Sequence, residues 1–233
     1  MQTDHEIIVM SVGGSLIVPD HIDTLFLTSL KNLIEDQIAT CGRRFIIIAG
    51  GGKTARRYQE AAGAVSNLDP EDLDWMGIHA TRLNGHLLRT VFRDTAHPVM
   101  ITNPDDVIDV PKNTPLIIAA GYRPGASTDL RAVQIAKRVH AHKLINLSNI
   151  DYVYTADPRK DAHATRIEET TWTEFRKLIP DEWSPGLSSP FDPVAAREAE
   201  SFNMEVVIIN GEKPDEIEHY LNNEAFVGTR IHN

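Results

Sequence analysis

The sequence predicts an α/β fold in which a mainly parallel sheet is covered by helices on both faces. Several short segments are apolar at every position rather than at alternate positions, which is typical of strands buried on both faces. These segments alternate with segments whose apolar residues recur at helical spacing. Such alternation is the pattern of a parallel sheet with crossover helices. We expect one domain spanning residues 1–233, a length that allows a large core.

The first half of the chain contains the strongest of these signals. Residues 7–10 and 45–49 are continuous apolar runs and predict buried strands. Helices are predicted at 20–39, at 53–62 and over a long segment that opens at Asp69, where the following proline and acidic residues favour a helix start. The apolar positions at helical spacing are Leu25, Leu30, Leu33, Ile34 and Ile38 in the first helix, and Leu73, Met76, Ala80, Leu83, Leu87 and Val91 in the long one.

The second half continues the alternation without an internal repeat, a low-complexity tract or a long linker. The simplest arrangement is therefore one continuous α/β unit with two functional lobes. Strands are predicted at 99–101, 116–119, 144–147 and 206–209, and helices at 130–140 and 192–201.

Composition narrows the class of protein. The formal net charge of −10 disfavours general binding to nucleic acids. The single cysteine, Cys41, excludes an intrachain disulfide and fits a reducing compartment. The first apolar run, 7–18, is too short to span a bilayer, and the residues before it are acidic rather than basic as in a signal peptide. We expect a cytoplasmic protein with no membrane partner.

Three glycine-containing turns follow predicted strands and precede predicted helices. They are Gly13-Gly14-Ser15, Gly50-Gly51-Gly52 and the stretch 121–129. Ligands of open α/β sheets bind at this edge, where glycine allows close approach and helix amino termini offer free N–H groups. Four cations stand nearby in the sequence, which favours phosphate binding: Lys53, Arg56, Arg57 and Arg123.

Two common phosphate-binding motifs are not matched. The Walker A loop needs a glycine five residues before Gly52-Lys53-Thr54, but Ile47 stands there. The dinucleotide fingerprint fits Gly50, Gly52 and Ala55, but it also needs a second strand that ends in an acidic residue about twenty positions later. That distance falls in 66–74, an expected loop and helix start, so a nicotinamide dehydrogenase is disfavoured.

The ten histidines do not predict a metal site. His79 and His86 would share a helix face, and His140 and His142 form a His-x-His pair. No carboxylate or cysteine completes a convincing ligand set around either pair, so no metal-ligating residue is expected.

The order of these motifs resembles that of the amino acid kinase family and, within it, the archaeal-type UMP kinases. The run Tyr154-Thr155-Ala156-Asp157-Pro158 is quite specific to the family, and Gly50-Gly51-Gly52-Lys53 points to the UMP kinase branch. The resemblance covers nearly the whole chain. Its segments are 13–15, 50–58, 74–78 with 81–82, 124–129, 149–151, 153–158, 160–161, 188–193 and 228–231.

The resemblance implies a three-layer αβα sandwich that transfers the γ-phosphoryl group of ATP to UMP with Mg²⁺. It implies an acceptor-binding lobe over about 1–140 and an ATP-binding lobe over about 141–233. The residues implied for ATP are Gly14, Ser15, Gly52, Arg56, Ser148, Asn149, Tyr154, Asp157 and Pro158. Those implied for UMP are Gly51, Asp74, Tyr122, Arg123, Pro124, Gly125, Ala126, Ser127 and Thr128.

Transfer between two phosphates needs alignment and neutralisation of charge rather than a deprotonating base. We therefore expect Lys53 to act as the catalytic cation and Asp129 to orient cations or the Mg²⁺ shell. Capping the helix that begins there is the alternative role for Asp129.

The chain departs from the family pattern at several positions. Many amino acid kinases have a lysine at the position of Ser11 and another at that of Asn149. Asn149 fits the archaeal-type branch, whereas Ser11 makes Lys53 the leading cation. Other departures are Ala120, Tyr122-Arg123 and Tyr152, which bear on nucleotide preference.

The sequence is also compatible with two other functions within the family. One is another small-phosphate kinase, such as an isopentenyl phosphate kinase, and the other is a non-catalytic nucleotide- or oxyanion-binding member, such as a molybdenum storage protein. Asp74 and the loop 124–129 favour a UMP kinase. The resemblance also implies a homo-oligomer, commonly a hexamer built from dimers, and the helix 71–94 is apolar enough to pack on a partner.

Overall fold

The computed structural model describes residues 6–182, 187 and 189–233. Ser188, which belongs to one of the family-like segments, is outside the described residues. A seven-stranded sheet forms the centre, in the order β3-β2-β1-β4-β8-β9-β7. Its strands are β1 (Ile7–Val12), β2 (Arg44–Ala49), β3 (Leu116–Ala119), β4 (Lys143–Ser148), β7 (Glu169–Thr171), β8 (Glu205–Asn210) and β9 (Gly228–His232).

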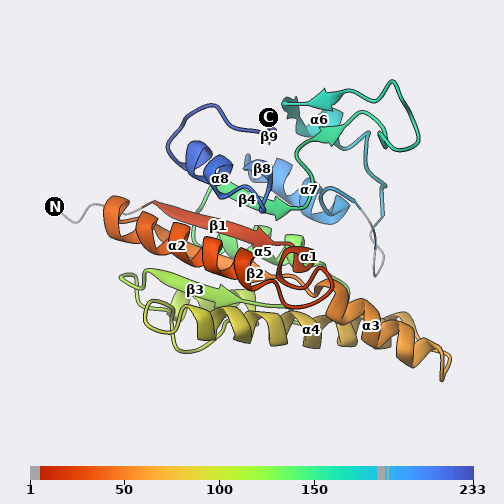
Figure 1. Cartoon of the computed structure of the whole chain (residues 1–233), viewed down its shortest axis with the longest axis horizontal. Coiled ribbons are helices and arrows are strands. Elements are labelled where there is room, and N and C mark those ends of the chain that lie inside the picture. Colours follow the sequence, from red (N-terminus) through yellow and green to blue (C-terminus); the bar gives the residue numbers. More distant parts are fainter. Residues whose placement is uncertain (1–5, 183–186, 188) are drawn as a thin grey trace.

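The predicted mainly parallel sheet is confirmed. The five strands β3, β2, β1, β4 and β8 are parallel, and only the pairing of β8 with β9 is antiparallel within the described sheet. The parallel strands all end on the same side, on the right in Figure 1. One sheet thus runs through both predicted lobes, whose division near residue 140 stays a prediction. A separate two-stranded unit contains β5 (Val153–Tyr154) and β6 (Arg166–Ile167).

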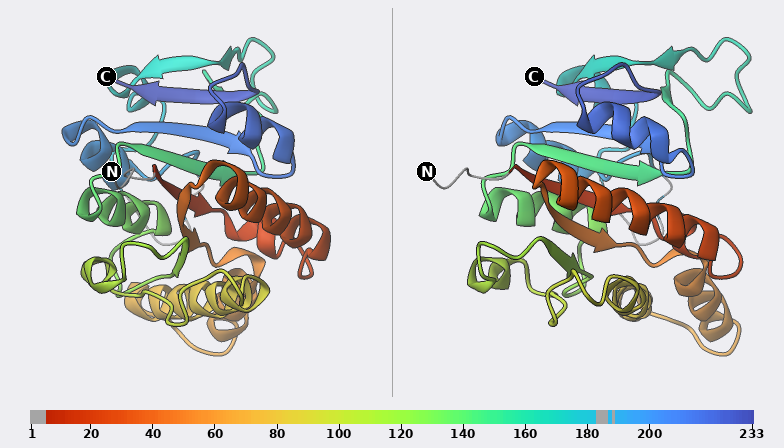
Figure 2. Two further views of the ribbon diagram at one scale, coloured as in Figure 1. Left: turned by 90° about the vertical axis from the view of Figure 1, so that its left-hand side faces the viewer. Right: turned by 60° about the vertical axis from the view of Figure 1, so that its left-hand side comes forward.

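Helices cover both faces of the sheet, as predicted. In β1, Val9 faces one apolar cluster with α5 and α7, whereas Ile8 and Met10 face the other with α2 and α8. Figure 2 shows α2 and α8 in front of the strands. The helices are α1 (Gly14–Ile17), α2 (Thr24–Cys41), α3 (Gly52–Gly63), α4 (Pro70–Val91), η1 (Pro104–Asp109), α5 (Thr128–Arg138), α6 (Trp172–Phe175), α7 (Pro193–Ser201) and α8 (Pro214–Leu221).

The buried face of α4 differs from the predicted apolar stripe. Leu83 was expected in that stripe, but it is 64% exposed. The residues that turn inward include Thr81 and Asn84, which a search for apolar periodicity does not select. These polar side chains are buried because they bind the backbone of the glycine turns, as described below.

Two further local predictions were wrong. Residues 99–101 do not form a strand: the chain bends at 98–99 and pairs with β3 through isolated bridges at Ala96 and Ile101. Leu25 was expected to pack inward, but it lies in the first turn of α2 and is 81% exposed.

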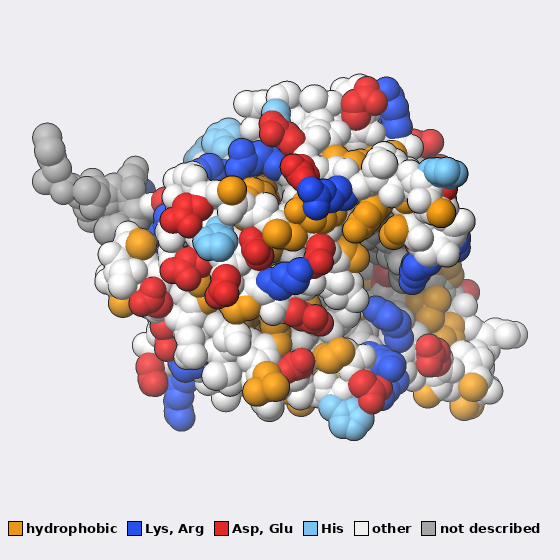
Figure 3. Space-filling view, turned by 45° about the horizontal axis from the view of Figure 1, so that its top comes forward, with side chains coloured by type: hydrophobic (Ala, Val, Ile, Leu, Met, Phe, Trp, Pro, Cys, Tyr) orange, Lys and Arg blue, Asp and Glu red, His pale blue; other side chains and the backbone are white. Residues whose placement is uncertain are grey.

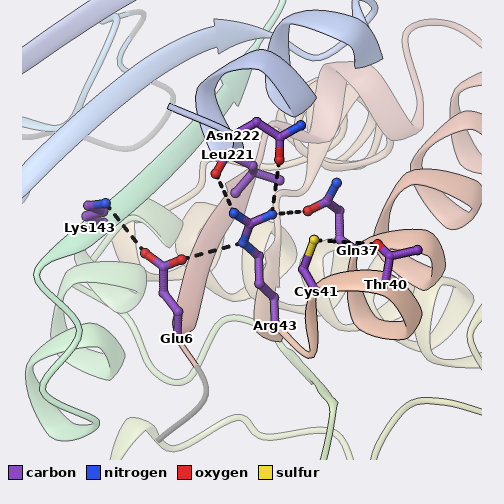
Figure 4. A network of polar contacts seen from close by, with 8 residues as sticks. All are labelled: Glu6, Gln37, Thr40, Cys41, Arg43, Lys143, Leu221 and Asn222. Atoms are coloured by element: carbon purple, nitrogen blue, oxygen red, sulfur yellow. Dashed lines mark hydrogen bonds and ion pairs between the residues drawn. The ribbon is translucent and has the colours of Figure 1, made fainter. Parts of the chain in front are cut away.

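The amino-terminal edge of the sheet is held by a polar network centred on Arg43 (Figure 4). The guanidinium donates to the carbonyl oxygen of Leu221 at 2.5 Å and also binds Gln37. Its Nε is 3.5 Å from Glu6, whose carboxylate also pairs with Lys143 at 3.5 Å. These contacts join the ends of α2 and α8 to the starts of β1 and β4.

Candidate active site

The first two glycine turns meet backbone to backbone at the carboxyl edge of the sheet. Gly14 follows β1 and Gly52 follows β2. A Cβ atom on Gly14 would lie 2.0 Å from the Gly52 nitrogen, so a side chain is excluded there. Gly52 has a φ of +61°, which disfavours other residues as well. The sequence therefore needs glycine at both positions to bring the two turns together.

A cleft of about 340 Å³ opens at this meeting point. It is lined by both glycine turns, by the segment that begins α5 and by the end of β4. The amino terminus of α3 also faces it, and Gly51 caps that helix without a side-chain hydrogen bond. In this first turn the Lys53 N–H already donates to the Val18 carbonyl oxygen at 3.2 Å, so an anion would meet the remaining N–H groups of the turn and the positive end of the helix dipole. Figure 3 shows the molecule hollowed on its right-hand side, with Lys and Arg side chains at the rim.

The structure brings five of the nine residues predicted for ATP into the lining of this cleft. They are Gly14, Ser15, Gly52, Arg56 and Ser148. The other four lie outside the lining. Asn149 follows β4, Tyr154 pairs with Arg166 between β5 and β6, and the carboxylate of Asp157 binds Arg159 at 3.0 Å, in the turn that includes Pro158.

The residues predicted for UMP separate into two groups. Gly51, Asp74, Ala126, Ser127 and Thr128 line the cleft. Asp74 also accepts a hydrogen bond from the Gly125 N–H at 2.8 Å, which ties α4 to residues 122–128, the predicted acceptor loop. Tyr122 and Arg123 line a different cavity, and neither Pro124 nor Gly125 contributes to the cleft lining. The expected acceptor loop therefore faces two cavities.

The cations near the second turn point in different directions. The Lys53 ammonium binds Asp20 at 2.9 Å, and Arg57 binds the same carboxylate at 2.7 Å. Lys53 is outside the cleft lining, whereas Arg56 is the one Lys or Arg side chain among the described lining residues. A catalytic role for Lys53 stays a prediction, and reaching the cleft would require its ammonium to leave Asp20.

Asp129 lies half-buried at the base of the cleft without a cationic partner among the described residues. Its carboxylate accepts hydrogen bonds from the Ser11 hydroxyl at 2.8 Å and from the Asp192 N–H at 3.3 Å. Burial raises the pKa of Asp129 to about 6; the Ser11 hydrogen bond opposes this rise, and the nearby Asp192 carboxylate adds to it. Ser11 thus provides Asp129 with a neutral hydrogen-bond donor. Ser127, rather than Asp129, caps α5 by accepting from the Leu130 N–H.

Sequence reasoning missed the side chains that hold the turns in place. Asn84 donates to the carbonyl oxygens of Gly50 at 2.8 Å and Gly51 at 3.1 Å. Thr81 accepts from the Gly121 N–H at 2.8 Å, and Asn146 donates to the Pro190 carbonyl at 3.0 Å. The available signal was the spacing of Thr81 and Asn84, two small polar residues three apart within a helix pattern.

Comparisons with known proteins identify the family. Residues 6–210 match the model of the amino acid kinase family. The chain belongs to the amino acid kinase family. It is 34% identical over 229 residues to a uridylate kinase from Methanocorpusculum labreanum, covering 97% of this chain and 95% of that protein. It is 32% identical over 225 residues to a uridylate kinase from Methanospirillum hungatei, covering 96% and 94%.

The fold agrees with that assignment. The crystal structure of uridylate kinase from Archaeoglobus fulgidus superposes with a TM-score of 0.81 at 27% identity, covering 96% of this chain and 99% of that one. The three-layer amino acid kinase fold predicted above is therefore confirmed. No helix in the described part of the chain is long and apolar enough to cross a membrane. Among the described residues, no three His, Cys, Asp or Glu side chains are grouped so that they could hold a metal ion.

Proposed function

We propose that this chain is a uridylate kinase that transfers the γ-phosphoryl group of ATP to UMP. The observation that carries the proposal is the agreement with relatives named uridylate kinase along nearly their whole length. The cleft supports it, because paired glycine turns and an uncapped helix amino terminus suit the phosphates of two nucleotides. Ser148 and Gly14, proposed for ATP, and Asp74, proposed for UMP, all line this one cleft.

The proposed chemistry asks little covalent work of the protein. The UMP phosphate is already a nucleophile at neutral pH, so the cleft must align two phosphates and neutralise the charge on the transferring group. Backbone N–H groups of the two turns and the Arg56 guanidinium are suited to that task. Bound Mg²⁺ would add positive charge. Such an ion keeps several waters and uses few carboxylates, so the cleft carboxylates Asp74 and Asp129 would face its water shell.

A coupled assay of ADP release tests the proposal. The acceptors are UMP, CMP, AMP and isopentenyl phosphate, each with ATP and Mg²⁺. We expect UMP to give the highest kcat/KM. A clear preference for another acceptor would refute the assignment, and so would ATP binding without turnover of any acceptor.

We also propose that the protein works as a homo-oligomer in the cytoplasm. Trp75 and Leu83 are exposed on the outer side of α4, and such apolar side chains suit a surface buried between subunits. Light scattering at micromolar concentration should give at least a dimer, and a monomer would contradict this part of the proposal.

A further inference from the structure

A second cavity, of about 520 Å³, lies beside Tyr122 and Arg123 at the start of the acceptor loop. It is bounded by η1, by the outer side of α5 and by the end of α7. Four cations line it: Arg123, Arg131, Lys137 and Arg138. Only two carboxylates line it, from Asp105 and Glu198, although the chain as a whole has a net charge of −10. The cavity is therefore a local concentration of positive charge in an acidic protein.

Both carboxylates already have partners. Glu198 pairs with Lys137 at 3.1 Å, and Asp105 pairs with Arg138 at 2.5 Å. Arg123 and Arg131 form no ion pair with any described residue, so the excess charge resides on these two guanidinium groups.

Arg131 is the unusual member of this pair because it is only 6% exposed. Of its five N–H donors, one binds the Gln134 side chain at 2.8 Å and another binds the Arg123 carbonyl oxygen at 3.1 Å. Its Nε has no hydrogen-bond partner among the described residues. Burial lowers the pKa of the Arg131 guanidinium, and the charge of Arg123 lowers it further. Buried charges in proteins are normally paired with an opposite charge. No described residue provides that partner for Arg131, so the site lacks an anion.

Tyr122 holds the two cations near one another. The Arg123 guanidinium lies 5.5 Å from the centre of the Tyr122 ring, and that of Arg131 lies 5.7 Å from it. Two like charges that share one ring repel each other, and a multivalent anion in the cavity would stabilise both. The guanidinium fork matches the oxygens of phosphate, to which it donates two parallel hydrogen bonds.

We propose that this cavity is a second anion site, separate from the cleft, that binds a phosphate-bearing small molecule through Arg123 and Arg131. The site would act on the acceptor loop, because Arg131 is bonded to the backbone of Arg123 and the same loop is tied to Asp74 at Gly125. Arg82 donates to the Tyr122 carbonyl oxygen at 2.8 Å and connects the loop to α4. Anion binding is therefore expected to order the segment 122–125. The binding assignment does not depend on the activity proposed for the cleft.

Calorimetric titration with tripolyphosphate tests the site. The background is Arg56→Gln, which removes the cation of the cleft. We compare it with Arg56→Gln/Arg123→Gln and with the control Arg56→Gln/Arg93→Gln, because Arg93 is an exposed arginine outside both cavities. Loss of Arg123 should weaken tripolyphosphate binding at least about tenfold, and loss of Arg93 should change it less than about twofold. Equal weakening by both changes, or no binding by the background protein up to about 10 mM, would overturn the proposal.

A second measurement covers the buried arginine. Tripolyphosphate should raise the Tm of the Arg56→Gln protein, because a ligand of the native state stabilises it. Arg56→Gln/Arg131→Gln should fold with similar circular dichroism and lose most of that Tm rise; an unchanged rise would contradict the site. Inorganic phosphate and a nucleoside triphosphate, titrated in the same way, identify the natural source of the phosphate. Because a nucleotide can also bind in the cleft, each titration is repeated with Arg56→Gln/Arg123→Gln, and only the affinity lost with Arg123 is assigned to this cavity. A larger loss for the nucleotide than for tripolyphosphate indicates a nucleotide effector, and an equal or smaller loss indicates a simple phosphate anion.

Discussion

The two cavities on either side of the acceptor loop are suited to anions in opposite ways. The cleft is built from main chain: two glycine turns in contact, a helix amino terminus and one lining cation, Arg56. The second cavity is built from side chains, with four cations on or near α5 and no glycine in its lining. Backbone donors are fixed by the fold and suit a reaction that needs accurate alignment. Arginine side chains bind phosphate by forked hydrogen bonds without close approach of the main chain, which suits binding without chemistry.

The largest effect is expected from adding a side chain to the main-chain site. Gly52→Ala places a Cβ 2.1 Å from the Gly14 carbonyl oxygen at a residue with φ of +61°. Backbone strain and the displaced turn should lower the free energy of unfolding by about 2–5 kcal/mol and abolish nucleotide binding. Urea unfolding and ATP titration measure the two effects.

Gly63→Ala is the matched control. Gly63 lies at the other end of the same helix, and a Cβ there would meet only Leu68 at 3.9 Å. We expect its stability to stay within about 1 kcal/mol of the parent, with ATP binding unchanged. If Gly52→Ala behaved like Gly63→Ala, close contact of the two turns would not be essential to the cleft.

The next effect concerns the single cation of the cleft. Arg56→Gln should lower kcat by about 10²–10³, because a preorganised charge near the transferring phosphoryl group is lost. Lys53→Gln removes the cation favoured by the sequence, which in this structure binds Asp20 at 2.9 Å. Steady-state kinetics of both variants separates the two roles. A larger loss for Lys53→Gln than for Arg56→Gln would mean that Lys53 leaves Asp20 during the reaction.

These two cations also illustrate what the sequence can and cannot predict. Five buried strands, their mainly parallel pairing and the glycine turns were predictable, because continuous apolar runs and Gly-Gly pairs leave few alternatives. The directions of neighbouring side chains were not. Lys53 and Arg56 are three residues apart on α3, yet one faces Asp20 on the rim and the other faces the cleft.

In the acceptor loop, too, the directions of the side chains could not be predicted from the sequence. Tyr122 and Ser127 belong to one loop, but they line different cavities because the loop passes between them. The buried polar face of α4 was missed for a related reason. Thr81 and Asn84 are buried to bind backbone groups of distant turns, and those partners are known only once the chain is folded.

The smallest expected effect is a pH-dependent stability at the base of the cleft. The pKa of Asp129 is raised from 3.8 to about 6, chiefly by burial. A carboxyl group whose pKa is higher in the folded protein stabilises the fold while it is protonated, and that contribution is lost as the pH rises through about 6. The difference corresponds to about 3 kcal/mol, reduced to about 2 kcal/mol because the side chain is only half-buried.

Asp129→Asn tests this directly, because the amide stays neutral at every pH. The variant should be more stable than the parent by about 2 kcal/mol at pH 8, and the two should converge as the pH falls from 6 towards 4. Urea unfolding across this range provides the measurement. Asp94→Asn, at an exposed site outside the cleft, should change stability by less than about 0.5 kcal/mol at both ends of the range. A constant difference between Asp129→Asn and the parent would show that burial does not destabilise the Asp129 carboxylate, because its hydrogen bonds from Ser11 and Asp192 would then offset the cost of burial.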